Sequence, residues 1–357
     1  MRERERARVW GWVGASMRQL TLRGLIEYVD RYEVSMHTDT LEVYDLFCGA
    51  GGFSTGARAA GCHVAFACDS CEEAIATHKR NHPTTAHKVC HLPCEIPLPT
   101  DGRRFHLHGS PPCQRFSPVN KRLRVDGDKE DALNLVEWYV EFALASRATS
   151  WTMEQVPAPE IMELMERVRS NNHARMAFGI FDFSKLGVPQ TRKRLIAGSP
   201  RLIARLMRAT EEQPRRNVRS VISKPRGTHI RNGKSWSERR KVNNKWVYTP
   251  ATWNDFCHSV DGLAPTVLGQ RPLDWVRPSG TGGWHDRFTV SELAALQTFP
   301  STYRWPNTKS RACPQIGNAV PPRVAQLLLE GESSIHPPAT TICMSPSLAR
   351  SGPLGRR

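Results

Sequence analysis

One cysteine stands in a setting that suits a nucleophile. It belongs to the peptide Gly109-Ser-Pro-Pro-Cys-Gln-Arg-Phe-Ser117, which follows the apolar stretch Phe105–His108. Two consecutive prolines fix the backbone in an extended conformation, so the side chain after them is presented rigidly. A thiol at Cys113, with Arg115 nearby, can ionise and attack an electrophilic carbon. We therefore predict that Cys113 is a nucleophile; the alternative is a rigid loop that carries an incidental cysteine.

A carboxylate and two arginines follow in two further peptides. Glu154 lies in Met153-Glu-Gln-Val-Pro157, at the end of an expected strand, where its carboxyl group can protonate or hydrogen-bond a ring nitrogen. Arg192 and Arg194 alternate in Gln190-Thr-Arg-Lys-Arg194, so in an extended segment they project to the same face. Two guanidinium groups placed in this way suit phosphate or carbonyl oxygens.

A glycine-rich peptide is the candidate for a cofactor site. It runs Asp45-Leu-Phe-Cys-Gly-Ala-Gly-Gly-Phe-Ser54, between an expected strand and an expected helix. Its glycines 49, 51 and 52 let the backbone turn sharply and approach a ligand closely. Asp69 ends the next expected strand, 24 residues after Asp45, where a carboxylate can accept hydrogen bonds from ribose hydroxyls. The pattern favours an adenosine-containing cofactor over a plain tight turn, and it lacks the GxGxxG spacing of a dinucleotide site.

The elements that must position these residues alternate between strands and helices, which indicates an α/β protein with a parallel, doubly wound sheet. After residue 198 a basic segment interrupts the alternation, and Thr-Val-Ser-Glu from Thr289 predicts a capping box that opens a helix. The expected strands are Leu41–Phe47, His63–Asp69, Phe105–His108 and Ser150–Val156, and the expected helices are Phe53–Ala60, Cys71–Asn81, Glu130–Ser146 and Ser291–Gln297.

Composition excludes several classes of protein. The chain has 357 residues, of which 39% are hydrophobic, and it has no apolar run long enough to span a bilayer. No export signal is recognisable, so we expect an intracellular protein whose ten cysteines are reduced thiols. Cys68, Cys71, Cys90 and Cys94 with His87 and His91 have zinc-like spacing, but Cys68 adjoins the ribose acid, so we predict no metal.

The net charge of +16 indicates a polyanionic partner, and most of the charge lies in one segment. Between residues 201 and 250 there are fourteen basic and three acidic residues, interleaved with Trp236, Trp246 and Tyr248. This mixture is typical of a surface that follows a nucleic-acid backbone, although a solvated basic insertion would have the same composition.

In order and spacing these peptides resemble the motifs of cytosine-5 DNA methyltransferases. The resemblance spans residues 41–330 and rests on five blocks: Asp45–Ser54, Pro111–Gln114, Gln190–Arg194, Arg287–Pro300 and Gln315–Pro322. It implies a Rossmann-like fold that binds S-adenosylmethionine, with a smaller basic target recognition domain. The implied organisation is an N-terminal extension (1–40), a catalytic domain (41–200), the recognition domain (201–285), a return to the catalytic domain (286–330) and a disordered tail (331–357).

The same resemblance implies a role for each site residue. Cys113 would add to carbon 6 of a flipped-out cytosine, Glu154 would hold N3, and Arg192 and Arg194 would grip the base carbonyl or a flanking phosphate. The implied cofactor residues are Asp45, Phe47 against adenine, Gly49, Gly51, Gly52, Phe53, Asp69 on the ribose, Pro111, Asn318 and Ala319. The implied substrate contacts are Gln114, Ser117, Thr266, Val267, Arg239 and Arg240.

Four positions depart from the family pattern. Gln155 replaces the usual Asn after the catalytic Glu, so we expect the geometry that braces the nucleophile loop to be adjusted rather than lost. Ser70 and Lys88 replace residues that contact adenine in the family, and Glu130 is nearest to the position of a missing Arg.

The expected partner is double-stranded DNA, bound by a monomer without a membrane. Two alternatives stay open: a methyltransferase of tRNA cytosine, which in the family carries a Cys-Phe-Thr tripeptide that is not found here, and a nucleic-acid-binding relative without catalysis. The expected location is the cytoplasm of a prokaryote or virus-infected cell, or a nucleus.

Overall fold

The computed structural model describes residues 40–112, 126–231, 237–242, 245–250, 257–269, 273–277 and 284–334. Residues 1–39, which make up nearly all of the expected extension, lie outside this part of the chain, as do Cys113, Gln114 and Ser117. For the strands that hold Arg239 and Arg240, only the backbone course is described.

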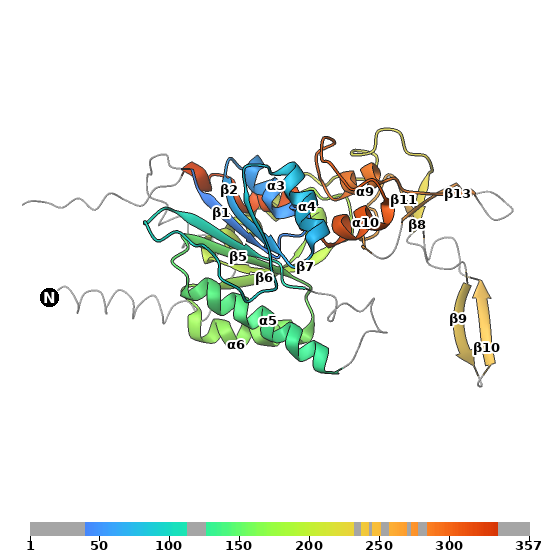
Figure 1. The fold of residues 1–357 in the computed structure, drawn as a ribbon. Coiled ribbons are helices and arrows are strands. Elements are labelled where there is room, and N and C mark those ends of the chain that lie inside the picture. The colour runs from blue at the N-terminus through green and yellow to red at the C-terminus, as the bar shows by residue number, and fades with distance from the viewer. Residues whose placement is uncertain are drawn as a thin grey trace, which may run out of the picture.

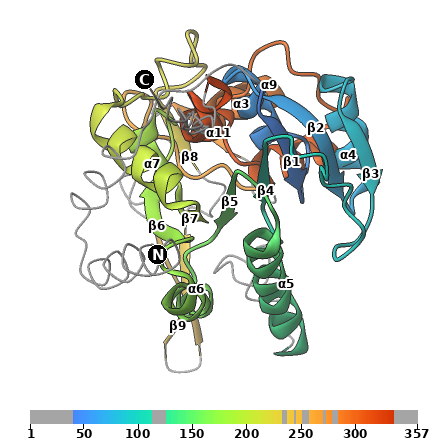
Figure 2. The same cartoon turned by 90° about the vertical axis from the view of Figure 1, so that its left-hand side faces the viewer.

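A seven-stranded sheet forms the centre of the larger domain, in the order β3-β2-β1-β4-β5-β7-β6 (Figures 1 and 2). Strands β1 to β5 are parallel, as the alternation predicts, whereas β7 runs antiparallel to both β5 and β6. The four expected strands are thus parallel, and the antiparallel β7 is an addition that the alternation did not predict. The strands are β1 Glu42–Leu46, β2 His63–Asp69, β3 Ala86–Val89, β4 Phe105–Gly109, β5 Ser150–Gln155, β6 Ala177–Asp182 and β7 Lys193–Gly198.

Helices cover both faces of this sheet (Figures 1 and 2). One face packs against α5 (Asp126–Ala145) and α6 (Pro159–Asn172) in a core that includes Tyr139. The opposite face packs against α3 (Gly52–Ala59), α7 (Pro200–Glu212) and α11 (Pro322–Leu329). Helix α4 (Glu72–Asn81) adjoins β2 and β3. Among the described residues, no helix is long and apolar enough to cross a membrane.

Helix α7 changes the expected domain boundary. Its apolar residues Leu202, Ile203, Leu206 and Ala209 recur at helical spacing and are buried in the core that faces α11. The helix therefore belongs to the catalytic domain. The expected boundary at residue 201 cuts off a helix that packs with the larger domain, so we propose that the smaller domain starts after Glu212.

The smaller domain contains a second sheet, in the order β11-β8-β12-β13. Its strands are β8 His229–Arg231, β11 Cys257–Ser259, β12 Asp274–Arg277 and β13 Trp284–Arg287, and its core includes Trp275 stacked on Phe288 at 4.1 Å. The same core takes in α9 (Val290–Leu296) and α10 (Lys309–Asn318). Strands β9 (Ser237–Val242) and β10 (Lys245–Pro250) pair antiparallel as a separate two-stranded sheet.

The start of α9 and the segment after α11 are fixed by polar contacts. The predicted capping box is confirmed, since Thr289 and Glu292 satisfy each other's backbone N–H groups. After α11, a short 3-10 helix (Glu332–Ser334) buries the Glu332 side chain completely, and Arg201 and Arg205 form ion pairs with it. The expected disordered tail therefore begins too early, because residues 331–334 are packed on the catalytic domain.

Buried histidines make the fold sensitive to acid. Burial lowers the pKa of His106 to about 3, and burial together with Arg58 lowers that of His82 to about 4. In the unfolded chain both titrate near 6.5, so the unfolded state binds more protons between about pH 4 and 6.5. Burial raises the pKa of Asp45 to about 7, which has the opposite effect in this window. The two histidines outweigh the single aspartate.

We therefore expect the free energy of unfolding to fall by a few kcal/mol between pH 6.5 and 4, at ~1.4 kcal/mol per unit of pKa shift. Urea denaturation across this range measures the loss. His106→Gln keeps a neutral side chain between Ser150 and Thr152, the hydroxyl partners of His106, so its stability should depend less on pH. Parallel pH profiles for His106→Gln and the unmodified protein would contradict this account.

Candidate active site

The carboxyl ends of β1, β2, β4 and β5 meet at one edge of the sheet, where parallel α/β sheets place their ligands. The turn after β1 uses three left-handed residues: Phe47 (φ 57°), Gly49 (φ 53°) and Gly51 (φ 93°). Asp69 holds this turn, because its Oδ2 accepts from the Gly49 N–H at 2.9 Å and its Oδ1 from the Cys71 N–H at 2.8 Å. Each carboxylate oxygen keeps further acceptor capacity for a ligand hydroxyl.

Two of the glycines are required by packing of the protein itself. A Cβ at Gly51 would lie 2.8 Å from the His78 ring, and one at Gly52 would collide with the backbone oxygen of Val320. The tight approach at these positions brings α3 against the segment around Ala319. The expected cofactor segment 318–319 therefore lies beside the glycine turn, with Asn318 exposed and Ala319 buried.

Two expected cofactor residues point elsewhere. Phe53 is 2% exposed, and its ring stacks on His108 with 3.5 Å between ring centroids, so it is a core residue. Asp45 is also buried, and its Oδ2 accepts a hydrogen bond from the Ser54 hydroxyl at 2.6 Å. Neither side chain is placed to touch a cofactor, because each is enclosed by the protein. Phe47, by contrast, is half-buried and meets Tyr139 edge-on at 6.4 Å.

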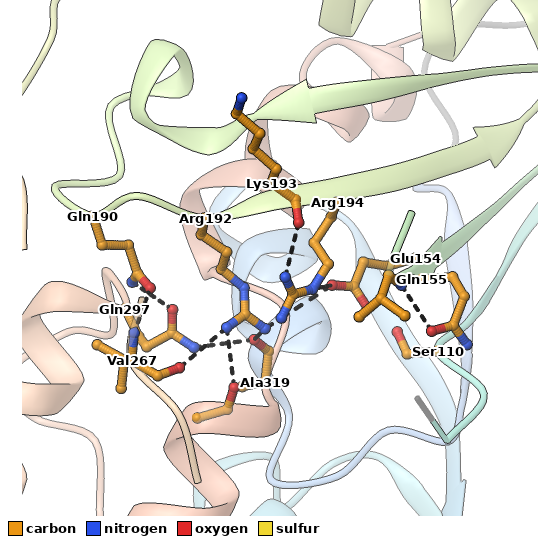
Figure 3. A network of polar contacts seen from close by, with 12 residues as sticks. Ser110, Glu154, Gln155, Gln190, Arg192, Lys193, Arg194, Val267, Gln297 and Ala319 are labelled. Carbon is orange, nitrogen blue, oxygen red and sulfur yellow. Dashed lines mark hydrogen bonds and ion pairs between the residues drawn. The ribbon is translucent and has the colours of Figure 1, made fainter. Parts of the chain in front are cut away.

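Glu154 lies at the end of β5 between two guanidinium groups (Figure 3). Its Oε1 is 2.9 Å from Arg194 Nε and 4.0 Å from Arg192 Nη2. The nearer contact is an ion pair, but the direction of the Arg194 N–H does not meet the geometry of a hydrogen bond. Within the described chain, this buried oxygen has no hydrogen-bond partner. The guanidinium groups compensate its charge, and its capacity to accept a hydrogen bond remains for a donor on a ligand.

Arg192 lies deeper than the resemblance implies. The side chain is 1% exposed, and its guanidinium donates to the backbone oxygens of Val267, Gly317 and Ala319 at 3.1 to 3.3 Å (Figure 3). A guanidinium enclosed in this way cannot grip a flanking phosphate. We correct that expectation: Arg192 joins β7, the segment around Val267 in the smaller domain and the end of α10.

Gln190 and Gln297 add hydrogen bonds to the junction that Arg192 forms between β7, the Val267 segment and the end of α10. The sequence analysis predicted no role for either glutamine. Gln190 Nε2 donates to Gln297 Oε1 at 2.7 Å, and Gln190 Oε1 accepts from the Val267 N–H at 3.0 Å. Gln297 Nε2 in turn donates to the backbone oxygen of Ile316 at 2.6 Å. Both glutamines lie in blocks that resemble the motifs of the family, Gln190–Arg194 and Arg287–Pro300. That resemblance is the one sequence signal that could have found them.

Thr266 and Val267 belong to this junction as well. The Thr266 hydroxyl donates to the backbone oxygen of Thr191, and the Val267 side chain is buried in the core of the smaller domain. Val267 was expected to contact substrate; its burial assigns it to the core instead.

Gln155 braces the peptide that leads to Cys113. Its side chain is fully buried, its Nε2 donates to the backbone oxygen of Pro111 at 3.1 Å, and its Oε1 accepts from the Val156 N–H at 2.8 Å. Pro111 is therefore enclosed and held through its carbonyl group. The longer amide in place of Asn is accommodated here without losing the contact.

The thiols near the glycine turn form no ligand set. Within the part of the chain that the structure describes, no group of three or more His, Cys, Asp or Glu side chains could hold a metal ion. Cys90 and Cys94 lie side by side, with 2.6 Å between their sulfurs, and burial raises the pKa of the Cys68 thiol.

Comparison with known proteins agrees with this architecture. The family model for C-5 cytosine-specific DNA methylases matches residues 41–262 and 204–331, so the chain belongs to that family. It is a DNA cytosine-5 methyltransferase. Among curated relatives it is 28% identical to the Type II methyltransferase M.HgiDI of Herpetosiphon aurantiacus (81% of this chain, 93% of the relative) and 26% identical to M.HindV of Haemophilus influenzae (81% and 95%).

Solved structures share the fold. The S. pombe Dnmt2 methyltransferase aligns with a TM-score of 0.56 at 16% identity, over 82% of this chain and 98% of that one. A DNA modification methyltransferase from an E. coli prophage aligns with a TM-score of 0.55 at 19% identity, with the same coverage.

The setting of Glu154 yields a direct prediction. Glu154→Gln keeps the shape of the side chain but removes its charge opposite Arg194 and its ability to exchange a proton. Methyl transfer at saturating DNA should fall by roughly two orders of magnitude or more. Glu163→Gln makes the same chemical change on the exposed side of α6 and should leave the rate unaltered. Turnover of Glu154→Gln close to that of the control would remove Glu154 from the mechanism.

Proposed function

We propose that this chain transfers a methyl group from S-adenosylmethionine to carbon 5 of a flipped-out cytosine in duplex DNA, through a covalent adduct with Cys113. The observation that carries the proposal is the geometry around β5. Glu154 presents a buried acceptor without a hydrogen-bond partner in the described chain, and the adjacent Gln155 fixes Pro111, two residues before Cys113. The acid and the nucleophile loop are thus held by consecutive residues of one strand.

The residues of the chain suit the proposed cofactor. Asp69 has its carboxylate fixed by two backbone N–H groups and retains acceptor capacity for ribose hydroxyls. Phe47 lies half-buried at the same turn and offers a ring to adenine, and Asn318 is exposed beside it. Bound S-adenosylmethionine would supply an electrophilic methyl group. Asp45 and Phe53 are buried next to this turn and would support it without touching the cofactor.

The proposed chemistry begins with the Cys113 thiolate. Its sulfur forms a bond to carbon 6, and the displaced electron pair makes carbon 5 nucleophilic. Carbon 5 takes the methyl group and then loses its proton; the returning electron pair restores the double bond between carbons 5 and 6 and expels the thiolate. Glu154 would hold N3 and the exocyclic amine, where charge develops. Arg194 fixes the Glu154 carboxylate, and Arg192 holds the surrounding junction.

The DNA-binding role is assigned to the recognition domain. Arg239 and Arg240 lie on β9, whose antiparallel partner β10 places Tyr248 opposite Arg239 and Val247 opposite Arg240. A two-stranded ribbon of this kind is narrow enough to enter the major groove. The basic residues of this ribbon and of the segment leading to it would contact phosphates or base edges.

The nucleophile is tested by trapping. Cys113→Ala should abolish methyl transfer while cofactor and DNA binding are retained, since neither needs the thiol. Duplex DNA containing 5-fluorocytosine should form a covalent adduct with the unmodified protein, because fluorine blocks the final loss of the carbon 5 substituent. Cys313→Ala, a change at a half-buried cysteine of α10, is the matched control. An adduct that persists in Cys113→Ala, or methylation of tRNA in preference to duplex DNA, would overturn the proposal.

The recognition role is tested by salt. Of the basic residues between 201 and 250, Arg201 and Arg205 are paired with Glu332, and one face of a small domain can meet DNA. We expect about five to eight phosphate contacts and a log–log slope of about −4 to −7 between ~50 and 200 mM salt.

Replacing Arg239, Arg240 and Lys241 together by Gln should flatten the slope by about 2 to 3 if all three contact phosphates, and should weaken all sequences alike. It should relax the target preference if one of them reads guanine. The control replaces Arg147, Arg167 and Lys309, which removes the same charge elsewhere. A slope near zero for the unmodified protein would show that the basic segment is a solvated surface.

A further inference from the structure

A basic cleft lies apart from the proposed active site. Its volume is about 1000 Å³, and it opens between the second halves of α3 and α4, the start of α11 and the turn after α9. Five arginines line it: Arg58, Arg80, Arg216, Arg304 and Arg323. No lining residue is an Asp or a Glu, and none is Asp69, Glu154, Arg194 or Asn318.

The charge of this cleft is not neutralised within the described chain. Arg201, Arg205 and Arg226 pair with carboxylates, whereas none of the five cleft arginines forms an ion pair with a described residue. The hydrogen bonds of their side chains go to neutral groups. Arg58 donates to the Asn81 backbone oxygen at 3.1 Å, and Arg323 donates to the side-chain oxygens of Gln213 and Gln326 at 2.7 and 2.9 Å. The guanidinium groups of Arg58 and Arg323 are thus held in place, and the charge of all five arginines remains available to an anion.

The wall of the cleft is fixed by contacts between distant segments. Asn81 at the end of α4 donates to the backbone oxygen of Arg304 at 3.0 Å and accepts from the Arg304 N–H at 2.8 Å. His82 lines the same cleft with 2% of its surface exposed, and within the described chain its Nδ1 has no hydrogen-bond partner. A buried ring nitrogen without a partner is an additional polar group that a ligand can engage.

The shape indicates an extended ligand. A second cleft of about 660 Å³ continues from the first, since both are lined by Arg216, Thr298, Pro300 and Tyr303. The second cleft also contains no carboxylate, and one wall of it is a cluster of aromatic rings with centroids 4.7 to 4.8 Å apart, in which Trp305 is half-buried and packs on the buried rings of Phe299 and Tyr303. Arginines followed by aromatic rings along a groove match the charge and the stacking surface of a nucleic-acid strand.

We propose that these two clefts form a second nucleic-acid site, which takes the phosphodiester backbone of a strand lying outside the catalytic cleft. The arginines hold successive phosphates, and Trp305 offers a ring on which a base can stack. A single small anion would leave most of the five guanidinium groups unpaired, so an extended polyanion suits the groove better. This site does not depend on the proposed catalytic mechanism.

The test uses a labelled dT20 oligonucleotide, which contains no cytosine, and measures its binding by fluorescence anisotropy over a series of salt concentrations. The cleft variant is Arg80→Gln with Arg304→Gln, because both side chains are exposed and have no hydrogen bond or ion pair to a described residue. The control variant is Arg147→Gln with Lys309→Gln, which removes the same charge from exposed positions outside both clefts. Trp305→Leu tests the stacking surface.

We expect the cleft variant to bind dT20 about tenfold more weakly at ~50 mM salt, with a log–log slope reduced by about 1 to 1.5, since each single-strand phosphate contributes ~0.7. The control variant should bind like the unmodified protein, and Trp305→Leu should weaken dT20 binding without changing the slope. Methyl transfer to a duplex should stay within about twofold in both charge variants, so failure of the proposed function would show separately, as absent methyl transfer in every protein.

Three results would overturn the second site. The first is equal loss of dT20 binding in the cleft and control variants, which would reflect general charge. The second is loss of all dT20 binding when Arg239, Arg240 and Lys241 are replaced while the cleft variant binds normally. The third is displacement of dT20 by inorganic phosphate beyond the effect of chloride at equal ionic strength, which would assign the cleft to a small anion.

Discussion

The buried guanidinium of Arg192 is the interaction on which the two-domain arrangement depends. A cation that is 1% exposed is tolerated only where charge and hydrogen bonds compensate the loss of water. Here three backbone oxygens, from Val267, Gly317 and Ala319, accept from it, and the Glu154 carboxylate lies within 4.0 Å. These partners come from the smaller domain, the end of α10 and β5. One planar group with fixed donor directions therefore ties the three segments together.

This constraint connects the active site with the smaller domain. Gln190 and Gln297 satisfy the remaining backbone groups at the junction, and the same peptide places Arg194 against Glu154. A shift of the recognition domain would move Val267 and, through Arg192, disturb the charge around the acid. Buried polar networks of this kind are costly when they are partly satisfied, so they favour one geometry over its neighbours. The site is thus held by the junction as much as by its own strand.

Local patterns in the sequence predicted much of this fold. Features that depend on contacts between residues far apart in the chain could not be predicted in this way. Strand β2 was predicted at its observed bounds and the capping box at Thr289 is confirmed, because both depend on neighbouring residues. The reversed direction of β7 carries no such local signal. Helix α7 did have one, in the spacing of Leu202, Ile203 and Leu206, but counting charge across the segment concealed it.

Among the site residues, too, those with partners that the strand order already brings together were predicted correctly, and those with distant partners were not. Gln155 was expected to preserve the brace on the nucleophile loop, and the contact with Pro111 is present, because it depends on two strand ends that the alternation already places side by side. Arg192 was expected near the substrate, yet its acceptors lie 75 to 127 residues further along the chain and are backbone oxygens, which no residue type reveals. Phe53 beside the glycines was assigned to the cofactor, whereas its ring stacks on His108.

The net charge shows why composition alone cannot locate a binding surface. Arg201 and Arg205 compensate the buried Glu332, and Arg226 compensates Asp286 and Glu292, so these cations stabilise the fold and are largely neutralised. What attracts a polyanion is the charge left after such pairing. Part of that excess lies in the cleft lined by Arg80 and Arg304, on elements outside the basic segment that dominates the sequence. A chain can therefore concentrate its arginines in one segment and still present unpaired positive charge on another face, because folding neutralises some cations and leaves others exposed.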